Sequence, residues 1–202
     1  MARVLLFGAG ATGARIARQL RSSGAADTLE IRDPSLERRE RLVDDLGDGA
    51  VAGHGRRISD DPAVVVVATP PGTQLDVARR AVREGIAVVT TSNQTSEVRR
   101  LLELDDEARS CRVPVVVGAG FMPGLSCVLA RHGAREFDEV EEIHVAKVGT
   151  GGPACARQHH RALSSTGIDW RDGRWMRRAG GSGRELAWFP DPVGGRDCYR
   201  AA

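Results

Sequence analysis

Residues 4–13 read VLLFGAGATG, and this stretch decides the fold of the chain. Its first four residues form an apolar run that predicts a buried strand. The glycines Gly8, Gly10 and Gly13 follow with the spacing G-x-G-x-x-G, and a helical pattern of apolar residues begins directly after them. The order of strand, glycine loop and helix is the fingerprint of a dinucleotide-binding βαβ unit.

Each glycine of this loop has its own physical role. Gly8 lets the chain turn sharply off the strand, and Gly10, which has no Cβ, lets the backbone approach a pyrophosphate. Gly13 lets the helix pack closely on the strand. The helix N-terminus then offers unpaired N–H groups and the positive end of a dipole to phosphate groups. Because the chain has 24 glycines, the rest of the sequence must support this interpretation.

Strand and helix patterns alternate along the first part of the chain. The run VVVVA at 64–68 is apolar and mostly β-branched, which is typical of a central parallel strand that is covered on both faces. Further strands are expected at 28–32, 50–52, 86–90 and 113–117, with helices between them. This alternation predicts an α/β fold with the doubly wound parallel sheet of a Rossmann domain.

The pattern changes after Gly118. A helix is expected from Leu125 to about His132, and residues 139–148 alternate as a strand. Residues 170–175 read WRDGRW and predict a hairpin whose turn is Asp-Gly. We therefore expect a Rossmann domain over 1–122 and a partial, β-rich domain over 123–202 that serves the substrate or oligomerisation.

Composition excludes several classes of function. The formal net charge is +2 over 202 residues and no basic block stands apart, so we expect neither nucleic acid nor a membrane as a partner. No apolar run is long enough to span a bilayer, and the first residues do not have the pattern of a signal peptide. The four cysteines lie far apart without a C-x-x-C pair, which favours reduced thiols. We expect a cytoplasmic protein.

Three segments resemble the saccharopine dehydrogenase-like NADP-binding family in its shorter bacterial form. They are the glycine loop, VVVVATPP at 64–71 and GFMPGLS at 120–126. The resemblance implies NADP or NAD as cofactor, a small-molecule substrate, and oxidoreduction at a C–N bond of an amino acid or imine. Members of the family usually continue through a longer substrate domain. The alternatives are a non-catalytic dinucleotide-binding module or truncated relic, and a related fold that binds another nucleotide such as S-adenosylmethionine.

Asp33 is the candidate for the adenosine end of the cofactor. It lies 20 residues after Gly13, at the end of the second expected strand, where an acid bonds the ribose. Together with Pro34 it is also a sound N-cap for the next helix. Arg32 is a candidate for the 2′-phosphate of NADP or a solvated charge, so the two residues leave NAD and NADP both open. The other residues expected to contact the cofactor are Ala11, Thr12, Thr69, Pro70, Thr91, Asn93, Phe121 and Met122.

Three residues are candidates for the proton transfer that amine or imine redox chemistry requires. They are Lys147, which is the only lysine, and the neighbours His159 and His160. Each also fits an ordinary place on the surface, and spacing alone selects none of them. Cys155 and His159 lack two further ligands at workable spacing, so no metal site is expected. Apolar surface around the tryptophans predicts a homo-oligomer that associates through residues after Pro123.

Overall fold

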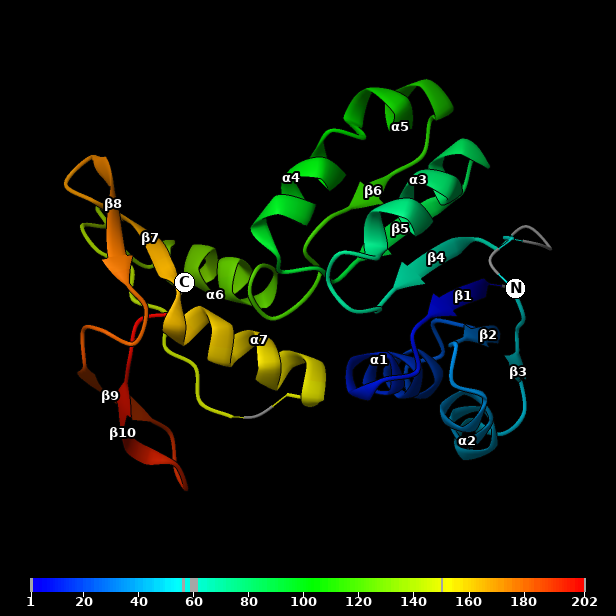
Figure 1. Ribbon diagram of the computed structural model, residues 1–202, viewed down its shortest axis with the longest axis horizontal. Helices are drawn as coiled ribbons and strands as arrows, with labels where there is room; N and C mark the ends of the chain where they lie inside the picture. The colour runs from blue at the N-terminus through cyan, green and yellow to red at the C-terminus, as the bar shows by residue number, and fades with distance from the viewer. Residues whose placement is uncertain (1, 56, 59–61, 150, 202) are drawn as a thin grey trace. The chain divides into compact units, whose positions relative to one another are not determined.

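The computed structural model describes residues 2–55, 57–58, 62–149 and 151–201 of the chain (Figure 1). The chain divides into two compact units, Met1–Val140 and Glu141–Ala202. This division by contacts lies further along the chain than the functional division between 1–122 and 123–202, which stays a prediction.

The first unit is built on a six-stranded parallel sheet with the strand order β3-β2-β1-β4-β5-β6. The order reverses between β1 and β4, because the chain crosses from one half of the sheet to the other at that point. This confirms the prediction of a doubly wound α/β sheet. The strands are β1 (Arg3–Phe7), β2 (Thr28–Arg32), β3 (Ala50–Ala52), β4 (Val64–Val67), β5 (Ala87–Thr90) and β6 (Val115–Val116).

Helices cover both faces of this sheet (Figure 1). Residues Leu6 and Ile31 pack in the apolar layer that faces α1 and α2, while Leu5 and Val65 pack in the layer that faces α3 and α4. Successive residues of β1 therefore enter opposite layers, which explains why the run VLLF contains no polar residue. The helices on the two faces are α1 (Ala11–Ser22), α2 (Leu36–Leu46), α3 (Gln74–Arg83), α4 (Thr95–Leu102) and α5 (Asp105–Cys111), and the unit also contains α6 (Leu125–Ala134).

The second unit consists of α7 (Pro153–Ser164) and two antiparallel hairpins, β7 (Thr166–Arg171) with β8 (Arg174–Ala179), and β9 (Glu185–Phe189) with β10 (Gly194–Cys198). The β-rich character of this part is confirmed, and so is the hairpin at 170–175. Trp170 pairs with Trp175, and their rings lie 4.9 Å apart in an edge-to-face arrangement. Asp172 and Gly173 both have positive φ, which a two-residue hairpin turn of this sequence requires.

Two elements of the second half differ from the sequence-based expectation. The strand expected at 139–148 is wrong, because this segment has no regular secondary structure and pairs with neither hairpin. Its apolar side chains, such as Ile143 and Val145, stay exposed. Helix α7 is not among the predicted elements. It buries no residue fully, and its apolar side chains are mostly small alanines, which give only a weak helical signal in a sequence.

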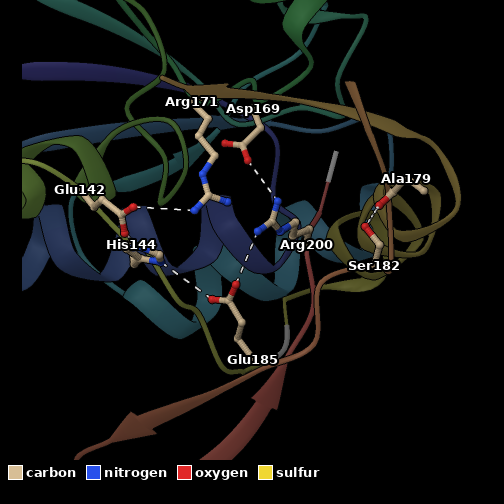
Figure 2. A network of polar contacts seen from close by, with 8 residues as sticks. All are labelled: Glu142, His144, Asp169, Arg171, Ala179, Ser182, Glu185 and Arg200. Atoms are coloured by element: carbon tan, nitrogen blue, oxygen red, sulfur yellow. Dashed lines mark hydrogen bonds and ion pairs between the residues drawn. The ribbon is translucent and has the colours of Figure 1, made fainter. Parts of the chain in front are cut away.

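A network of polar side chains connects the hairpins of the second unit (Figure 2). Arg200 lies 3.2 Å from Asp169 on β7 and 3.5 Å from Glu185 on β9. His144 lies 2.9 Å from Glu142 and 3.9 Å from Glu185. Apart from Arg200, which is 30% exposed, these side chains are well exposed, so solvent screens the contacts and each stabilises the unit only weakly. Among the described residues, no helix is both long and apolar enough to cross a membrane.

Candidate cofactor-binding site

Two glycines at the junction of β1 and α1 are required by the packing of the protein itself. Gly8 has a φ of +105°, and a Cβ at this position would lie 2.5 Å from the carbonyl oxygen of Ala68. A Cβ on Gly13 would lie 1.8 Å from the carbonyl oxygen of Gly8. Any larger side chain at either position would displace backbone. These contacts agree with a sharp turn at Gly8 and close helix packing at Gly13.

Gly10 lies in a different environment. It is the N-cap of α1 with a φ of −74°, which other residues adopt easily, and no described atom lies within 4 Å of where its Cβ would be. The fold therefore does not require glycine here, and the space in front of the helix is open. Ala11 and Thr12 in the first turn are exposed, and this turn carries no acidic residue. The loop can accept an anion such as a pyrophosphate on its backbone N–H groups.

Asp33 binds the glycine loop directly. Its carboxylate accepts a hydrogen bond from the N–H of Ala9 at 2.8 Å, and others from the N–H of Ser35 and the guanidinium of Arg38, each at 2.8 Å. The side chain is 6% exposed. Burial acts to raise the pKa of Asp33, but these hydrogen bonds outweigh it and hold the pKa below its ordinary value. Asp33 therefore stays charged at neutral pH.

The side chain of Arg32 is buried and makes its contacts inside the protein. Its guanidinium, 4% exposed, lies 2.6 Å from the carboxylate of Glu30, stacks over the ring of Phe7 at 5.5 Å, and donates to the carbonyl oxygen of Arg57. Contact with a 2′-phosphate would require it to leave all of these partners.

Arg38 is the exposed arginine next to Asp33, with 55% of its side chain accessible. Arg38 is not among the residues predicted from the sequence to contact the cofactor. The signal that would have found it is its position in the first turn of the helix that Ser35 caps, directly after Asp33.

The candidates after β4 and β5 lie at the same edge of the sheet as the glycine loop, because the carboxyl ends of parallel strands meet there. Gly8 packs against the peptide of Ala68 and Thr69, which joins the two loops directly. Thr91 donates its hydroxyl to the carbonyl of Val67 at 3.1 Å, so its side chain lies on the end of β4. Pro70 and Asn93 are exposed at this edge.

The turn after β6 is closed by its own backbone. Gly120 donates to the carbonyl oxygen of Pro123 at 3.2 Å, and a Cβ on Gly124 would lie 2.2 Å from the carbonyl oxygen of Gly120. Phe121 and Met122 project from this turn and are exposed. Their proximity to a nicotinamide stays a prediction.

Of the three catalytic candidates, the structure brings two together in the second unit. The Nζ atom of Lys147 lies 3.1 Å from Nε2 of His159. Burial lowers the pKa of His159, and the charges of Lys147 and His160 lower it further. The imidazole is therefore neutral at pH 7 and accepts a hydrogen bond from the ammonium group. His160 is exposed beside it. The described residues contain no cluster of three or more His, Cys, Asp or Glu side chains that could hold a metal.

Comparison with known proteins places this geometry in a family. The sequence model of an oxidoreductase family with an NAD-binding Rossmann fold matches residues 2–119, which is more than half of the chain. The structure of apo saccharopine dehydrogenase (L-Glu forming) from Saccharomyces cerevisiae is similar with a TM-score of 0.69 and 18% identity, over 100% of this chain and 50% of that one. The chain thus spans half the length of this relative. The predicted resemblance is confirmed as one of fold.

Two other solved structures are similar over the first part of the chain. Myo-inositol dehydrogenase from Corynebacterium glutamicum matches with a TM-score of 0.52 and 24% identity, over 70% of this chain and 43% of that one. GenD2 from gentamicin A biosynthesis, in complex with NAD, matches with a TM-score of 0.51 and 25% identity, over 66% of this chain and 38% of that one.

Proposed function

Because the chain belongs to the oxidoreductase family with an NAD-binding Rossmann fold, we propose that it is an NAD(P)-dependent oxidoreductase that acts at a C–N bond of an amino acid or imine. The observation that carries the proposal is the contrast within the glycine loop. Gly8 and Gly13 are required by the packing of the protein, whereas Gly10 faces open space at the N-terminus of α1. A bound dinucleotide explains the glycine at position 10, because its pyrophosphate needs to approach the backbone closely there.

The substrate class is supported by the turn at 120–126 and by the likeness of the whole chain to saccharopine dehydrogenase. A bound NAD(P) would supply the hydride chemistry of this reaction. Oxidation of an amine also requires a base for the proton on nitrogen, and reduction of an imine requires an acid. The pair of Lys147 and His159 fits both directions, since the imidazole is unprotonated at neutral pH and the ammonium beside it carries a proton.

Binding is the first test. Purified protein is titrated with NADPH and NADH, with nicotinamide fluorescence as the signal, and at least one of them is expected to bind well below millimolar concentration. Gly10→Val should abolish the signal, because the valine side chain fills the space in front of the helix. Arg109→Ala is the matched control, since Arg109 is exposed on α5 and its guanidinium pairs with the likewise exposed Asp105 of the same helix. Wild-type protein that binds neither nucleotide would overturn the proposal.

Turnover is the second test. Oxidation of saccharopine and of simple amino acids by NADP⁺ and NAD⁺ is followed by the absorbance of the reduced nicotinamide. Turnover that is lost in Gly10→Val and kept in Arg109→Ala supports the oxidoreductase. Tight nicotinamide binding without turnover of any amino acid or imine would instead favour the non-catalytic dinucleotide-binding module.

A further inference from the structure

Two buried polar side chains, Gln74 and Glu97, connect the loops that follow β4 and β5. Gln74 begins α3 and is 1% exposed, while Glu97 lies in the first turn of α4 and is 5% exposed. Neither is needed to fill the core, because apolar side chains such as Leu75 and Leu101 already attach these helices to the sheet. Burying an amide and a carboxylate is costly unless all of their hydrogen bonds are made.

Glu97 caps a helix other than its own. Its carboxylate accepts hydrogen bonds from the backbone N–H groups of Gly72, Gln74 and Leu75, at 2.8, 2.8 and 3.3 Å, and from the hydroxyl of Ser92 at 2.6 Å. The negative charge thus lies at the positive end of the α3 dipole. Burial acts to raise the pKa of Glu97, but the four hydrogen bonds lower it, so the group is a carboxylate at neutral pH.

Gln74 joins the same two loops through its amide. Its Nε2 donates to the carbonyl oxygen of Thr69 at 2.7 Å, on the β4 side. Its Oε1 accepts from the backbone N–H groups of Thr91 and Ser92, each at 3.0 Å, on the β5 side. A single side chain therefore fixes the distance between the two loops at the carboxyl edge of the sheet.

We infer that Gln74 and Glu97 are positioning residues that hold these two loops in the shape that receives the nicotinamide half of the cofactor. The inference rests on the proposed function. The loops follow β4 and β5, on one side of the point where the strand order reverses, and ligands of such sheets bind at that point. The glycine loop and Asp33 follow β1 and β2, and Asp33 takes its hydrogen bonds from Ala9, Ser35 and Arg38.

The hydrogen bonds of Asp33 involve neither Gln74 nor Glu97, so the two halves of the cofactor should respond differently. Loss of a contact in the Gln74–Glu97 pair should disturb the nicotinamide half and leave the adenosine half unchanged. If Gln74 and Glu97 only stabilised the fold, their loss would weaken the binding of both halves alike, because the glycine loop lies at the same edge of the sheet.

The experiment compares two probes by calorimetry. The whole cofactor is NADPH or NADH, whichever binds more tightly, and the probe without nicotinamide is 2′-phospho-ADP-ribose or ADP-ribose, respectively. Glu97→Gln places an amide against N–H donors and should weaken binding of the whole cofactor about tenfold, as expected for one or two lost buried hydrogen bonds. The probe without nicotinamide should bind within about twofold of its wild-type affinity. Ser92→Ala removes only the 2.6 Å contact and gives a second, milder variant if Glu97→Gln does not fold.

Arg83→Ala is the matched control. Arg83 is exposed at the opposite end of α3 and pairs with Glu107, so its loss perturbs the same helix without touching the loops. It should leave both affinities unchanged. Equal losses for the two probes, or unchanged affinity for the whole cofactor in both variants, would overturn the inference while the proposed function stands. Wild-type protein that binds neither probe overturns the proposed function, and the inference falls with it.

Discussion

The carboxylate of Asp33 accepts a hydrogen bond from the backbone N–H of Ala9 at 2.8 Å, and this contact ties the end of β2 to the glycine loop after β1. The acid at this position thus organises the loop from inside the protein. Its second oxygen accepts from Ser35 and Arg38 and so also fixes the start of α2. Contact with a ribose would be added to this structural role.

Asp33→Ala should lower both stability and cofactor affinity. The N–H groups of Ala9 and Ser35 lose their acceptor, which costs about 1–3 kcal/mol of unfolding free energy. Because the pKa of Asp33 is lowered by folding, its contribution is complete above the ordinary pKa of 3.8 and is lost as the pH falls below it. Urea unfolding at neutral and acid pH measures this. The difference between wild type and variant should shrink in acid, and a difference independent of pH would contradict the assignment.

Alanine at Gly13 should lower the stability of the protein, whereas alanine at Gly10 should weaken cofactor binding. Gly13→Ala brings a methyl group against the carbonyl oxygen of Gly8 and should destabilise the fold by about 3 kcal/mol or more. Gly10→Ala meets no described atom and should unfold like wild type, but bind NADPH more weakly. Chemical denaturation and fluorescence titration separate the two effects. Equal stability of the two variants would refute the packing argument.

Arg38 should decide the preference for NADPH over NADH. It is exposed next to Asp33, whereas Arg32 is held in a buried ion pair. Arg38→Ala is expected to weaken NADPH binding about tenfold and to leave NADH binding unchanged. Arg41→Ala is a matched control, because Arg41 is exposed on the same helix and pairs with Glu37. A parallel loss for both nucleotides would exclude a role in cofactor choice.

The contact between Lys147 and His159 should be visible in the titration of the imidazole. Lys147→Met removes a positive charge that lowers the pKa of His159, so this pKa should rise in the variant. NMR titration of the histidine ring measures it directly. Under the proposed function, the acid limb of kcat/KM shifts to higher pH with it. Arg157→Gln on the same helix serves as a charge control, and an unchanged pKa in Lys147→Met would show that the pair does not form in solution.

The second unit should mediate self-association. Trp175 on β8 and Trp188 on β9 are strongly exposed, the latter by 79%, and apolar surface of this kind favours burial against a partner. Light scattering should give a mass above that of one chain, and Trp188→Ser should lower it. A monodisperse monomer at high protein concentration would disprove the prediction.

Local sequence determined the framework of this protein. An apolar run of residues that enter both helical layers makes a parallel strand, and Gly13 is required by the nearby carbonyl oxygen of Gly8. The turn at Asp172 and Gly173 is equally local, since two residues with positive φ suffice to reverse the chain. Each of these features depends on near neighbours, which a sequence displays directly.

Only the tertiary structure decided where the polar side chains at the sheet edge point. Alternation along β2 turns Arg32 to the face of Glu30 and Phe7, where a buried ion pair holds it, and leaves Arg38 exposed. Glu97 caps a helix that begins 23 residues earlier, so no local pattern announces it. The segment 139–148 alternates as a strand but has no strand beside it to pair with. Hydrogen bonds and ion pairs between distant residues depend on which elements the fold brings together. No short stretch of the sequence shows which elements those are.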